Sequence, residues 1–428
     1  MPRHSNETDW IVQVNESLEP MPSDDQQHWG KRSIYKVPGR STNLNRKTYR
    51  PLAVSFGPYH YGQKHLYPME EHKHRALLHF VRRSRKPPER FLESLREVEE
   101  DLMASYEALA PEWKEGSGKG IASKFLQLMI TDGCFMLEIL RTTTEEVNGY
   151  ASNDPIFSKH GQHYALPDIK RDMLLLENQL PMLVLERLVA VCGDMKEDNY
   201  INRLILNFYF PSANNPTMGK CLHVLDVYRK SMLMDTKKKD KGKNDDSDKL
   251  IRPATELHEH GVQFEVSDNT SLNDVSFASG VLRLPKFPVD DDTESIFLDL
   301  IAFERSHVGA GNEVTSYICF MDDIIDKGRD VALLRSKGII QNFMESDEAA
   351  AKLFNSLAKD VKLDPDSSLR DVMNEVKEYF KKRRHMWWAN LMHTYFRNPW
   401  VILSLIAAVV LFGLTAIQTV YAVLSYKK

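Results

Sequence analysis

The C-terminal segment is the feature that most constrains the fold of this 428-residue chain. No side chain from residue 398 to residue 426 carries a charge. Residues 399–423 would form an α-helix about 37 Å long at about 1.5 Å per residue, which is longer than a hydrocarbon core of about 30 Å. The pattern therefore predicts a transmembrane helix over 399–424, and a buried core helix is the alternative.

Basic and aromatic side chains come just before this segment, as is typical of the cytoplasmic membrane interface. The expected interface residues are Lys381, Lys382, Arg383, Arg384, Trp387, Trp388, Tyr395 and Trp400. Residues 369–395 also place apolar side chains near one helical face, which predicts an amphipathic helix packed on the domain or lying on lipid. An ordinary solvated basic helix end is the alternative.

The N-terminal segment MPRHSNETDW has no apolar stretch typical of a secretory signal. Together with a single C-terminal span, this predicts a tail anchor. We expect a single-pass membrane protein that contacts the bilayer through 399–424 and keeps the bulk of its chain in the cytosol. The sequence leaves open whether the membrane is the plasma membrane or an endomembrane.

Charge and cysteine content exclude several classes of protein. The formal net charge is −4 and the pI is about 6.4, so no global positive field indicates a nucleic-acid partner. The four cysteines are widely spaced without a CxxC pair, which fits free thiols better than a disulfide framework or a zinc site. We expect no cofactor.

The remaining chain predicts a mainly α-helical domain with a few short β-strands. Residues 1–30 are polar and predict a disordered N-terminus. The family domain is expected over 31–395, helix-rich from about 70 to 230 and again from about 293, with strands near 261–266 and 275–285. The run KKKDKGKNDDSDK predicts a disordered charged loop at 236–250. One domain with a looped-out insertion is favoured over two domains.

Two carboxylates lie on stripes of apolar residues at helical spacing. Asp132 falls within KFLQLMITDGCFMLEILR, and Glu177 falls within DMLLLENQLPMLVLERL, where Pro181 must break or restart a helix. A buried carboxylate requires partners. The expected partners are free backbone N–H groups near the break, or basic residues such as His72, Arg75 and Arg171.

The favoured interpretation of Asp132 and Glu177 is structural, as members of a buried polar network that fixes the packing of the helices. An acid–base pair in an open cleft is the alternative, and it would require both carboxylates to face one pocket within about 5–10 Å. No nucleotide-binding or nucleophile-elbow motif occurs in the chain. The sequence therefore names no catalytic residue.

Other polar clusters are weaker candidates for metal sites. His72, His74 and His79 lack HExxH spacing, and Glu256, His258, Glu259 and His260 form a second group. The acidic run 290–294 lacks the spacing of an EF-hand and predicts a helix N-cap at Asp292 or Thr293. Solvated surface side chains are the default for all three clusters, and no metal ligand is assigned.

Several blocks, in order along the chain, resemble the plant domain-of-unknown-function 247 family, also known as the UPF0481 family. The blocks are IYKVPGRSTNLNRKTYRPLAVSFGPYHYGQKHLYPMEEHKHRALLHF, DGCFMLEILR, DMLLLENQLPMLVLERL, ATELHEHGVQFEV, LRLPKFPVDDDTESIFLDLIAFERSH and SYICFMDDIIDKGRDVALLRSKGII. The resemblance implies a mostly helical plant protein with one C-terminal transmembrane helix. It supplies no enzymatic activity, cofactor or catalytic residue.

Two classes of function remain open from the sequence. The first is a membrane-anchored recognition or signalling component with an unidentified protein partner, related to the self-incompatibility role associated with some grass members of the family. The second is a carboxylate-dependent hydrolase of unknown substrate.

Overall fold

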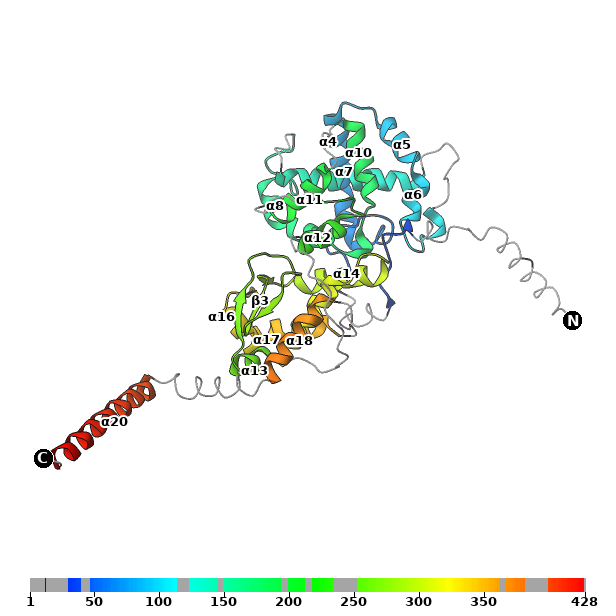
Figure 1. Cartoon of the computed structure of the whole chain (residues 1–428). Coiled ribbons are helices and arrows are strands. Elements are labelled where there is room, and N and C mark those ends of the chain that lie inside the picture. The colour runs from blue at the N-terminus through cyan, green and yellow to red at the C-terminus, as the bar shows by residue number, and fades with distance from the viewer. Residues whose placement is uncertain are drawn as a thin grey trace. The chain divides into compact units, whose positions relative to one another are not determined.

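Figure 1 shows the computed structural model of the whole chain, which folds into two compact units. Unit 1 comprises Met1–Lys230 and Arg305–Ala310, and unit 2 comprises Ser231–Glu304 and Gly311–Lys428. The structure describes residues 12, 30–39, 47–113, 123–144, 149–193, 199–211, 218–234, 252–359, 361, 367–381 and 399–426. The predicted mainly helical character with few strands is confirmed over these residues.

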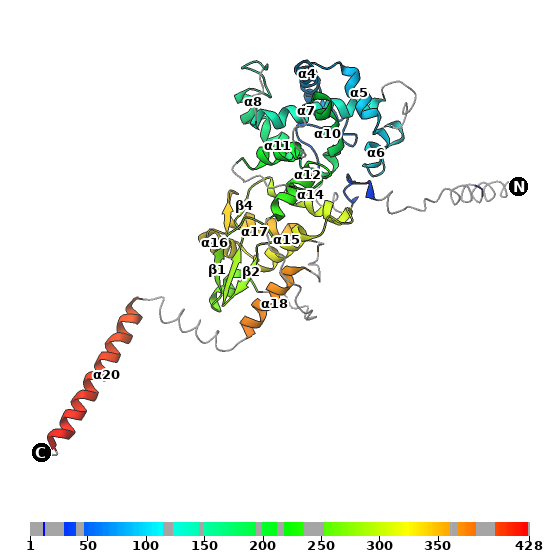
Figure 2. The same cartoon turned by 45° about the horizontal axis from the view of Figure 1, so that its top comes forward.

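Unit 1 is helical and is built around α7, which packs against α4, α5, α10 and α11 (Figures 1 and 2). Its helices are η1 (Lys64–Leu66), α4 (Tyr67–Ser84), α5 (Pro88–Arg96), α6 (Glu99–Ala104), η2 (Pro111–Trp113), α7 (Lys124–Thr144), α8 (Lys159–Tyr164), α9 (Leu166–Asp172), η3 (Leu176–Asn178), α10 (Met182–Cys192) and α11 (Tyr200–Tyr209). Helix α12 (Val224–Leu233) begins in unit 1 and ends in unit 2.

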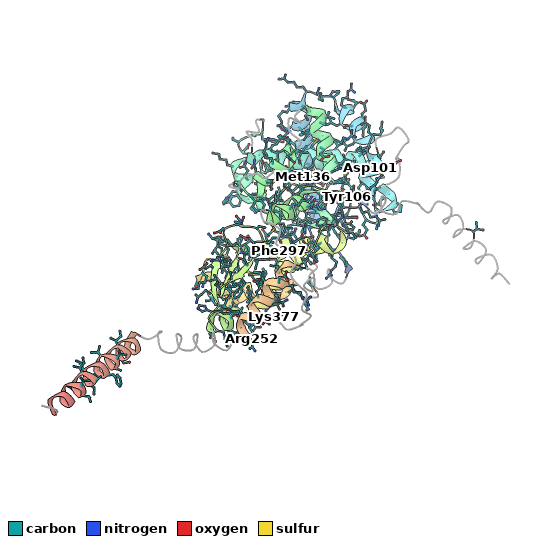
Figure 3. The ribbon with its side chains drawn as sticks, viewed as in Figure 1. Asp101, Tyr106, Met136, Arg252, Phe297 and Lys377 are labelled. Atoms are coloured by element: carbon teal, nitrogen blue, oxygen red, sulfur yellow. The ribbon has the colours of Figure 1, made fainter. Side chains whose placement is uncertain are left out.

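Helix α7 is apolar on nearly all sides, so it is buried along most of its length. The predicted stripe on α7 is confirmed: Phe125, Leu128, Met129, Phe135, Met136 and Ile139 are all buried. Met136 is labelled in Figure 3 and has no exposed surface. The core of unit 1 therefore lies around this helix.

Unit 2 combines helices with two small sheets (Figure 2). Its elements are α13 (Ala254–Glu259), β1 (Gln263–Val266), β2 (Ser276–Ala278), β3 (Val281–Leu284), β4 (Phe287–Val289), α14 (Thr293–Ser306), α15 (Glu313–Ile324), α16 (Gly328–Ser336), β5 (Ile340–Asn342), α17 (Asp347–Leu357), α18 (Ser368–Lys381) and α20 (Pro399–Tyr426). The first sheet has the order β1-β3-β2, with β1 parallel and β2 antiparallel to β3. The second pairs β4 with β5 in parallel.

Strands β2 and β3 are joined by a tight hairpin turn. Ser279 and Gly280 both have positive φ angles, of 53° and 86°, the combination that two-residue hairpins of matching twist require. A Cβ atom at Gly280 would also lie 2.6 Å from the Tyr379 hydroxyl of α18. Glycine is therefore needed at this position for both its backbone conformation and its small size.

Helix α18 places its apolar face inside unit 2. Leu369, Val372, Met373 and Val376 are buried, and the Phe380 ring lies 4.3 Å from the His260 ring. Packing on the domain, one of the two arrangements expected for the amphipathic segment 369–395, is observed for residues 369–380, and residues 382–395 lie outside the described ranges.

The predicted transmembrane helix is not supported. Among the residues that the structure describes, no helix is both long enough and apolar enough to cross a membrane. The expected span over 399–424 is thus corrected, and the fold class is mainly helical with a few short strands.

Several predictions fall on residues outside the described ranges. The N-terminal region 1–30 is described only at Val12 and Gly30, and the charged loop 236–250 is not described. Of the expected membrane-interface residues, Lys382, Arg383, Arg384, Trp387, Trp388 and Tyr395 lie outside the description. Lys381 ends α18 and Trp400 lies in α20, but their side chains are not described.

Candidate functional site

The polar centre of unit 1 is formed around a segment with little regular structure, residues 47–57. Val54 and Phe56 in this segment are completely buried. Buried backbone N–H groups need acceptors, and an irregular segment has no ladder or helix to supply them. The acceptors come instead from carboxylate and amide side chains of α7, α9 and η3.

Asp132 on α7 is the innermost of these side chains and has no exposed surface. Its Oδ2 atom accepts a hydrogen bond of 2.8 Å from the backbone N–H of Gly57. Its Oδ1 atom lies 2.8 Å from Lys73 Nζ on α4. Lys73 is also completely buried, and its Nζ atom lies 2.7 Å from Glu70 Oε1.

The close approach at Gly57 explains the glycine at this position. Gly57 has a φ angle of 70°, and a Cβ atom there would lie 2.8 Å from the Tyr106 hydroxyl and 3.0 Å from the carbonyl oxygen of Gln179. A larger residue would push the chain away from Asp132. The glycine therefore allows the backbone N–H to reach the buried carboxylate.

Asp132 and Lys73 form an ion pair at neutral pH. Burial raises the pKa of Asp132 to about 6, although Lys73 opposes this shift. Burial also disfavours the charged form of Lys73, but the carboxylates of Asp132 and Glu70 outweigh it and raise the Lys73 pKa. A charge without its partner in this position would be strongly destabilising.

Glu177 lies in η3 and holds a second irregular segment, residues 31–39. Its Oε1 atom accepts a hydrogen bond of 2.8 Å from Val37 N–H, and its Oε2 atom lies 3.7 Å from His60 Nε2. The Glu177 side chain keeps 18 % of its surface exposed. Burial raises the pKa of Glu177, and burial lowers the pKa of His60 to about 4, so His60 is neutral.

Three further residues complete this network, and sequence reasoning gave no sign of a role for Asp172. Asp172, at the end of α9, accepts hydrogen bonds from the backbone N–H groups of residues 52, 53 and 54. Asn178 accepts from Phe56 N–H at 2.7 Å and donates to Val54 O at 3.0 Å. Gln179 donates to the carbonyls of residues 173 and 175 and accepts from residue 225.

The expected partners and helical geometry need correction. Residues 173–181 are not one α-helix: α9 ends at Asp172, η3 covers three residues, and α10 begins at Met182, just after Pro181. Arg75 pairs with Asp154, and its guanidinium also contacts His72. Arg171 binds the neighbouring Asp172. The basic partner of Asp132 is Lys73.

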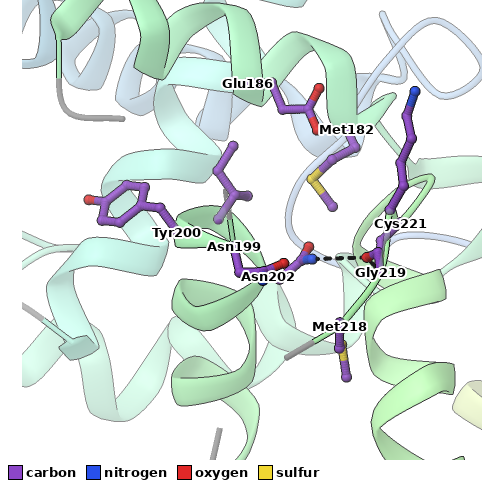
Figure 4. Close-up of a pocket in the computed structure, with 10 residues that line it drawn as sticks. Met182, Glu186, Asn199, Tyr200, Asn202, Met218, Gly219 and Cys221 are labelled. Carbon is purple, nitrogen blue, oxygen red and sulfur yellow. Dashed lines mark hydrogen bonds between the residues drawn. The ribbon is translucent and has the colours of Figure 1, made fainter. Parts of the chain in front are cut away.

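The two sequence-selected carboxylates do not line the cavity that unit 1 presents between α10, α11 and residues 218–221 (Figure 4). This cavity has a volume of about 450 Å³. Its lining combines thioether, amide, carboxylate and ammonium groups, and it consists of Met182, Glu186, Asn199, Tyr200, Ile201, Asn202, Met218, Gly219, Lys220 and Cys221.

The cavity contains one thiol, that of Cys221. Burial raises the pKa of Cys221 to about 11, and the Lys230 ammonium only partly opposes the shift. The thiol donates to the carbonyl oxygen of Gly219 at 3.4 Å, and the Asn202 amide donates to the same oxygen at 3.5 Å. The thiolate is the nucleophilic form of cysteine, so this raised pKa disfavours a nucleophilic role for Cys221.

Side chains of the three polar clusters that were weaker candidates for metal sites form local contacts. His79 stacks on Tyr150, and His258 and His260 contact the carbonyls of Val262 and Glu256. The Thr293 hydroxyl donates to Asp290, and α14 starts at Thr293. Within the described ranges, no three histidine, cysteine, aspartate or glutamate side chains gather in a way that could hold a metal ion.

Comparison with known proteins shows that the chain is similar to plant proteins. The family DUF247, described as "Plant protein of unknown function", matches residues 34–414. UPF0481 protein At3g47200 of Arabidopsis thaliana is 32 % identical over 435 residues, covering 93 % of this chain and 88 % of the relative. Putative UPF0481 protein At3g02645 of Arabidopsis thaliana is 22 % identical over 521 residues, covering 96 % and 94 %. No solved structure matches.

Proposed function

This chain belongs to the plant protein family DUF247, and we propose that it acts as a protein-interaction component in recognition or signalling. The interaction site is the cavity between α10, α11 and residues 218–221, where a side chain or short segment of a partner protein binds. Recognition of the self-incompatibility type, associated with some grass members of the family, is one form that this function can take.

The observation that carries the proposal is the chemistry of the cavity wall. Met182 and Met218 line the cavity, and each keeps only 4 % of its surface exposed; their flexible thioether side chains can repack around a bound group. The Glu186 carboxylate and the Lys220 side chain add hydrogen-bonding and charged groups at the same wall. A concave site with apolar surface and a few polar groups is the usual form of a ligand-binding site.

The arrangement of the carboxylates gives no support to the hydrolase alternative. A hydrolytic carboxylate must reach substrate or water, within hydrogen-bonding distance of the reacting atom. Asp132 is completely buried, and both of its oxygens are engaged by Gly57 N–H and Lys73 Nζ. Glu177 is engaged by Val37 N–H. Neither carboxylate belongs to the cavity wall.

Gly219 offers a direct test, because it borders the cavity and is exposed, and a Cβ atom there would meet no other atom within 4 Å. We expect Gly219→Trp to occupy the cavity with little effect on folding. Gly219→Ala is the matched control, because its methyl group leaves most of the volume open. The measurement is proximity labelling in plant cells with the full chain of wild type and both variants.

The expected result is that wild type and Gly219→Ala label a shared set of neighbouring proteins, and that Gly219→Trp loses part of it. Thermal melting of each purified variant shows whether the fold is intact. Identical labelling by all three folded proteins would refute a role for the cavity in partner binding.

A further inference from the structure

Basic side chains are concentrated in the turn between α4 and α5. Within residues 82–86, four of the five residues are basic and none is acidic. Arg82, Arg85 and Lys86 are exposed. Pro87 and Pro88 follow directly and are exposed as well. We call residues 82–88 the basic turn.

The base of the basic turn is fixed to the core of unit 1. The Arg83 guanidinium pairs with Glu138 of α7, whose side chain has no exposed surface. The Tyr150 hydroxyl donates to the other oxygen of Glu138 at 2.8 Å. The Ser84 hydroxyl donates to the carbonyl of Val81 at 2.7 Å and accepts from Lys86 N–H at 3.2 Å. These contacts hold the backbone that carries the exposed cations.

Arg83 thus pairs with a buried carboxylate, whereas the other three cations of the turn have no anionic partner among the described residues. Within the described part of the chain, Arg82, Arg85 and Lys86 form no ion pair and no side-chain hydrogen bond. Lysine or arginine in the last turn of a helix stabilises the helix dipole, which accounts for Arg82. Arg85 and Lys86 lie beyond the helix end, so this explanation does not extend to them.

Arg85 also adopts a backbone conformation that disfavours its side chain. It caps α4 in the left-handed region, with φ of 54° and ψ of 25°. Glycine is the usual residue at such a helix end, because any Cβ atom is disfavoured there. A long basic residue in this place is less favourable than glycine, and among the described residues its side chain forms no hydrogen bond or ion pair that offsets the cost. Residues kept in such strained conformations are enriched at functional sites.

We propose that the basic turn is a docking surface for a short acidic peptide segment of a partner protein. Carboxylates of the segment pair with Arg82, Arg85 and Lys86, since charge-assisted hydrogen bonds to arginine are strong and directional. Leu78 is 55 % exposed and lies one helical turn before Arg82 on α4. It provides an apolar contact beside the charges.

The charges around the basic turn favour a short peptide over a nucleic acid. Glu89 on α5 is exposed and directly follows the turn, and the exposed Glu93 lies one helical turn further on, where it pairs with Arg90 at 3.4 Å. A long polyanion crossing the turn would meet these carboxylates, whereas a short segment fits between them and Leu78. This surface is separate from the cavity at α10 and α11, so the two proposals can fail independently.

The test is fluorescence anisotropy with the full chain and three probes: an oligoglutamate peptide carrying one leucine, an oligouridylate of equal charge, and vesicles containing phosphatidylserine. The triple variant Arg82→Ser/Arg85→Gly/Lys86→Ser removes the three cations. We expect it to bind the peptide about tenfold more weakly than wild type. Wild-type binding should also weaken strongly at about 0.5 M salt.

Two controls separate binding from folding and from total charge. The variant Lys64→Ser/Arg96→Ser/Lys159→Ser removes three exposed cations elsewhere in unit 1 and should bind like wild type. Arg85→Gly alone should raise the melting temperature by about 2 °C, because glycine tolerates the left-handed conformation, while it weakens peptide binding. Equal loss in both triple variants, or tighter binding of the RNA or vesicle probe than of the peptide, would overturn the proposal.

Discussion

The sheet of β1, β2 and β3 in unit 2 and the irregular segment 47–57 in unit 1 satisfy the polar groups of their backbones in different ways. In unit 2, strands β1, β2 and β3 pair through backbone ladders, in which both donor and acceptor belong to the main chain. In unit 1, the irregular segment 47–57 depends on side chains: Asp132, Asp172 and Asn178 accept its N–H groups. The first arrangement tolerates changes of side chain, whereas the second can be lost through one substitution.

This difference shows which part of the fold is most easily destabilised by a single substitution. A backbone ladder survives most substitutions because every residue except proline keeps its N–H group. A side-chain acceptor is lost outright when it is replaced, and the orphaned donors cost about 1–3 kcal/mol each. Three variants test this contrast.

The largest expected effect is that of Asp132→Ala. The change leaves Lys73 buried with only Glu70 as a counter-charge and orphans the Gly57 N–H group. We expect the free energy of unfolding to fall by about 4 kcal/mol, measured by urea denaturation. Lys73→Met added to Asp132→Ala should restore part of the loss, because it removes the unpaired charge. Wild-type stability of the single variant would show that the ion pair does not support the fold.

An intermediate loss of folding stability is expected at acidic pH. His223 is buried, donates from Nε2 to Ser33 O and accepts at Nδ1 from Asp226 N–H, so it must be neutral. Burial lowers its pKa from 6.5 to about 4, although Asp226 opposes the shift. The unfolded chain therefore takes up a proton first, and stability is lost as pH falls from about 6.5 to about 4, by up to about 3 kcal/mol.

His223→Gln keeps a donor for Ser33 and removes the titrating ring. Its stability should fall less than that of wild type between pH 6.5 and pH 4, as measured by thermal melting at each pH. The exposed His74→Gln is the control and should follow wild type, because its ring is solvated in both states. If the melting temperatures of wild type and His223→Gln fall equally between pH 6.5 and pH 4, His223 is not a source of the acid sensitivity.

The smallest effect is expected in unit 2. Glu265 on β1 and Arg283 on β3 are cross-strand neighbours whose charged atoms lie 2.9 Å apart, and both side chains are about half exposed. Glu265→Ala should cost only about 0.5 kcal/mol, because solvent screens the pair and the backbone ladder remains. Hydrogen exchange of the β1 amides provides the measurement. If Glu265→Ala reduces the protection of the β1 amides as much as Asp132→Ala reduces protection around Gly57, the sheet and the segment 47–57 do not differ in their dependence on side chains.

The sequence predicted the regular part of the fold well. Strands β1, β2 and β3, the apolar stripe of α7 and the buried face of α18 all follow from periodicity. Strands β4 and β5 have three residues each, too few for an alternating pattern to appear. The predicted single domain over 31–395 stays a prediction, and the expected span over 399–424 is not supported within the described residues.

The polar network could be predicted only in part. Asp132 and Glu177 stood out because they interrupt apolar stripes, but their partners did not. A buried lysine looks like any polar residue on the outer face of a helix, so the expected basic partners were His72, Arg75 and Arg171, and Lys73 was missed. Residues 173–184 have helical spacing of apolar groups, yet the chain there is mostly irregular until α10. Every residue except proline has a backbone N–H group, so the sequence does not show which of these groups will donate to a buried side chain.

The asymmetry of these hydrogen bonds has a consequence for sequence variation among relatives. At positions 172 and 178 the side chain is the acceptor, so few substitutions preserve the bond. At positions 52–54 and 56 the donor is the backbone, so the residue type can change in any way that packing allows without loss of the hydrogen bond. Proline is the exception, because it has no N–H to give. Pro51 stands immediately before the first donor, Leu52, and a proline shifted one place further along would break the first contact of the series.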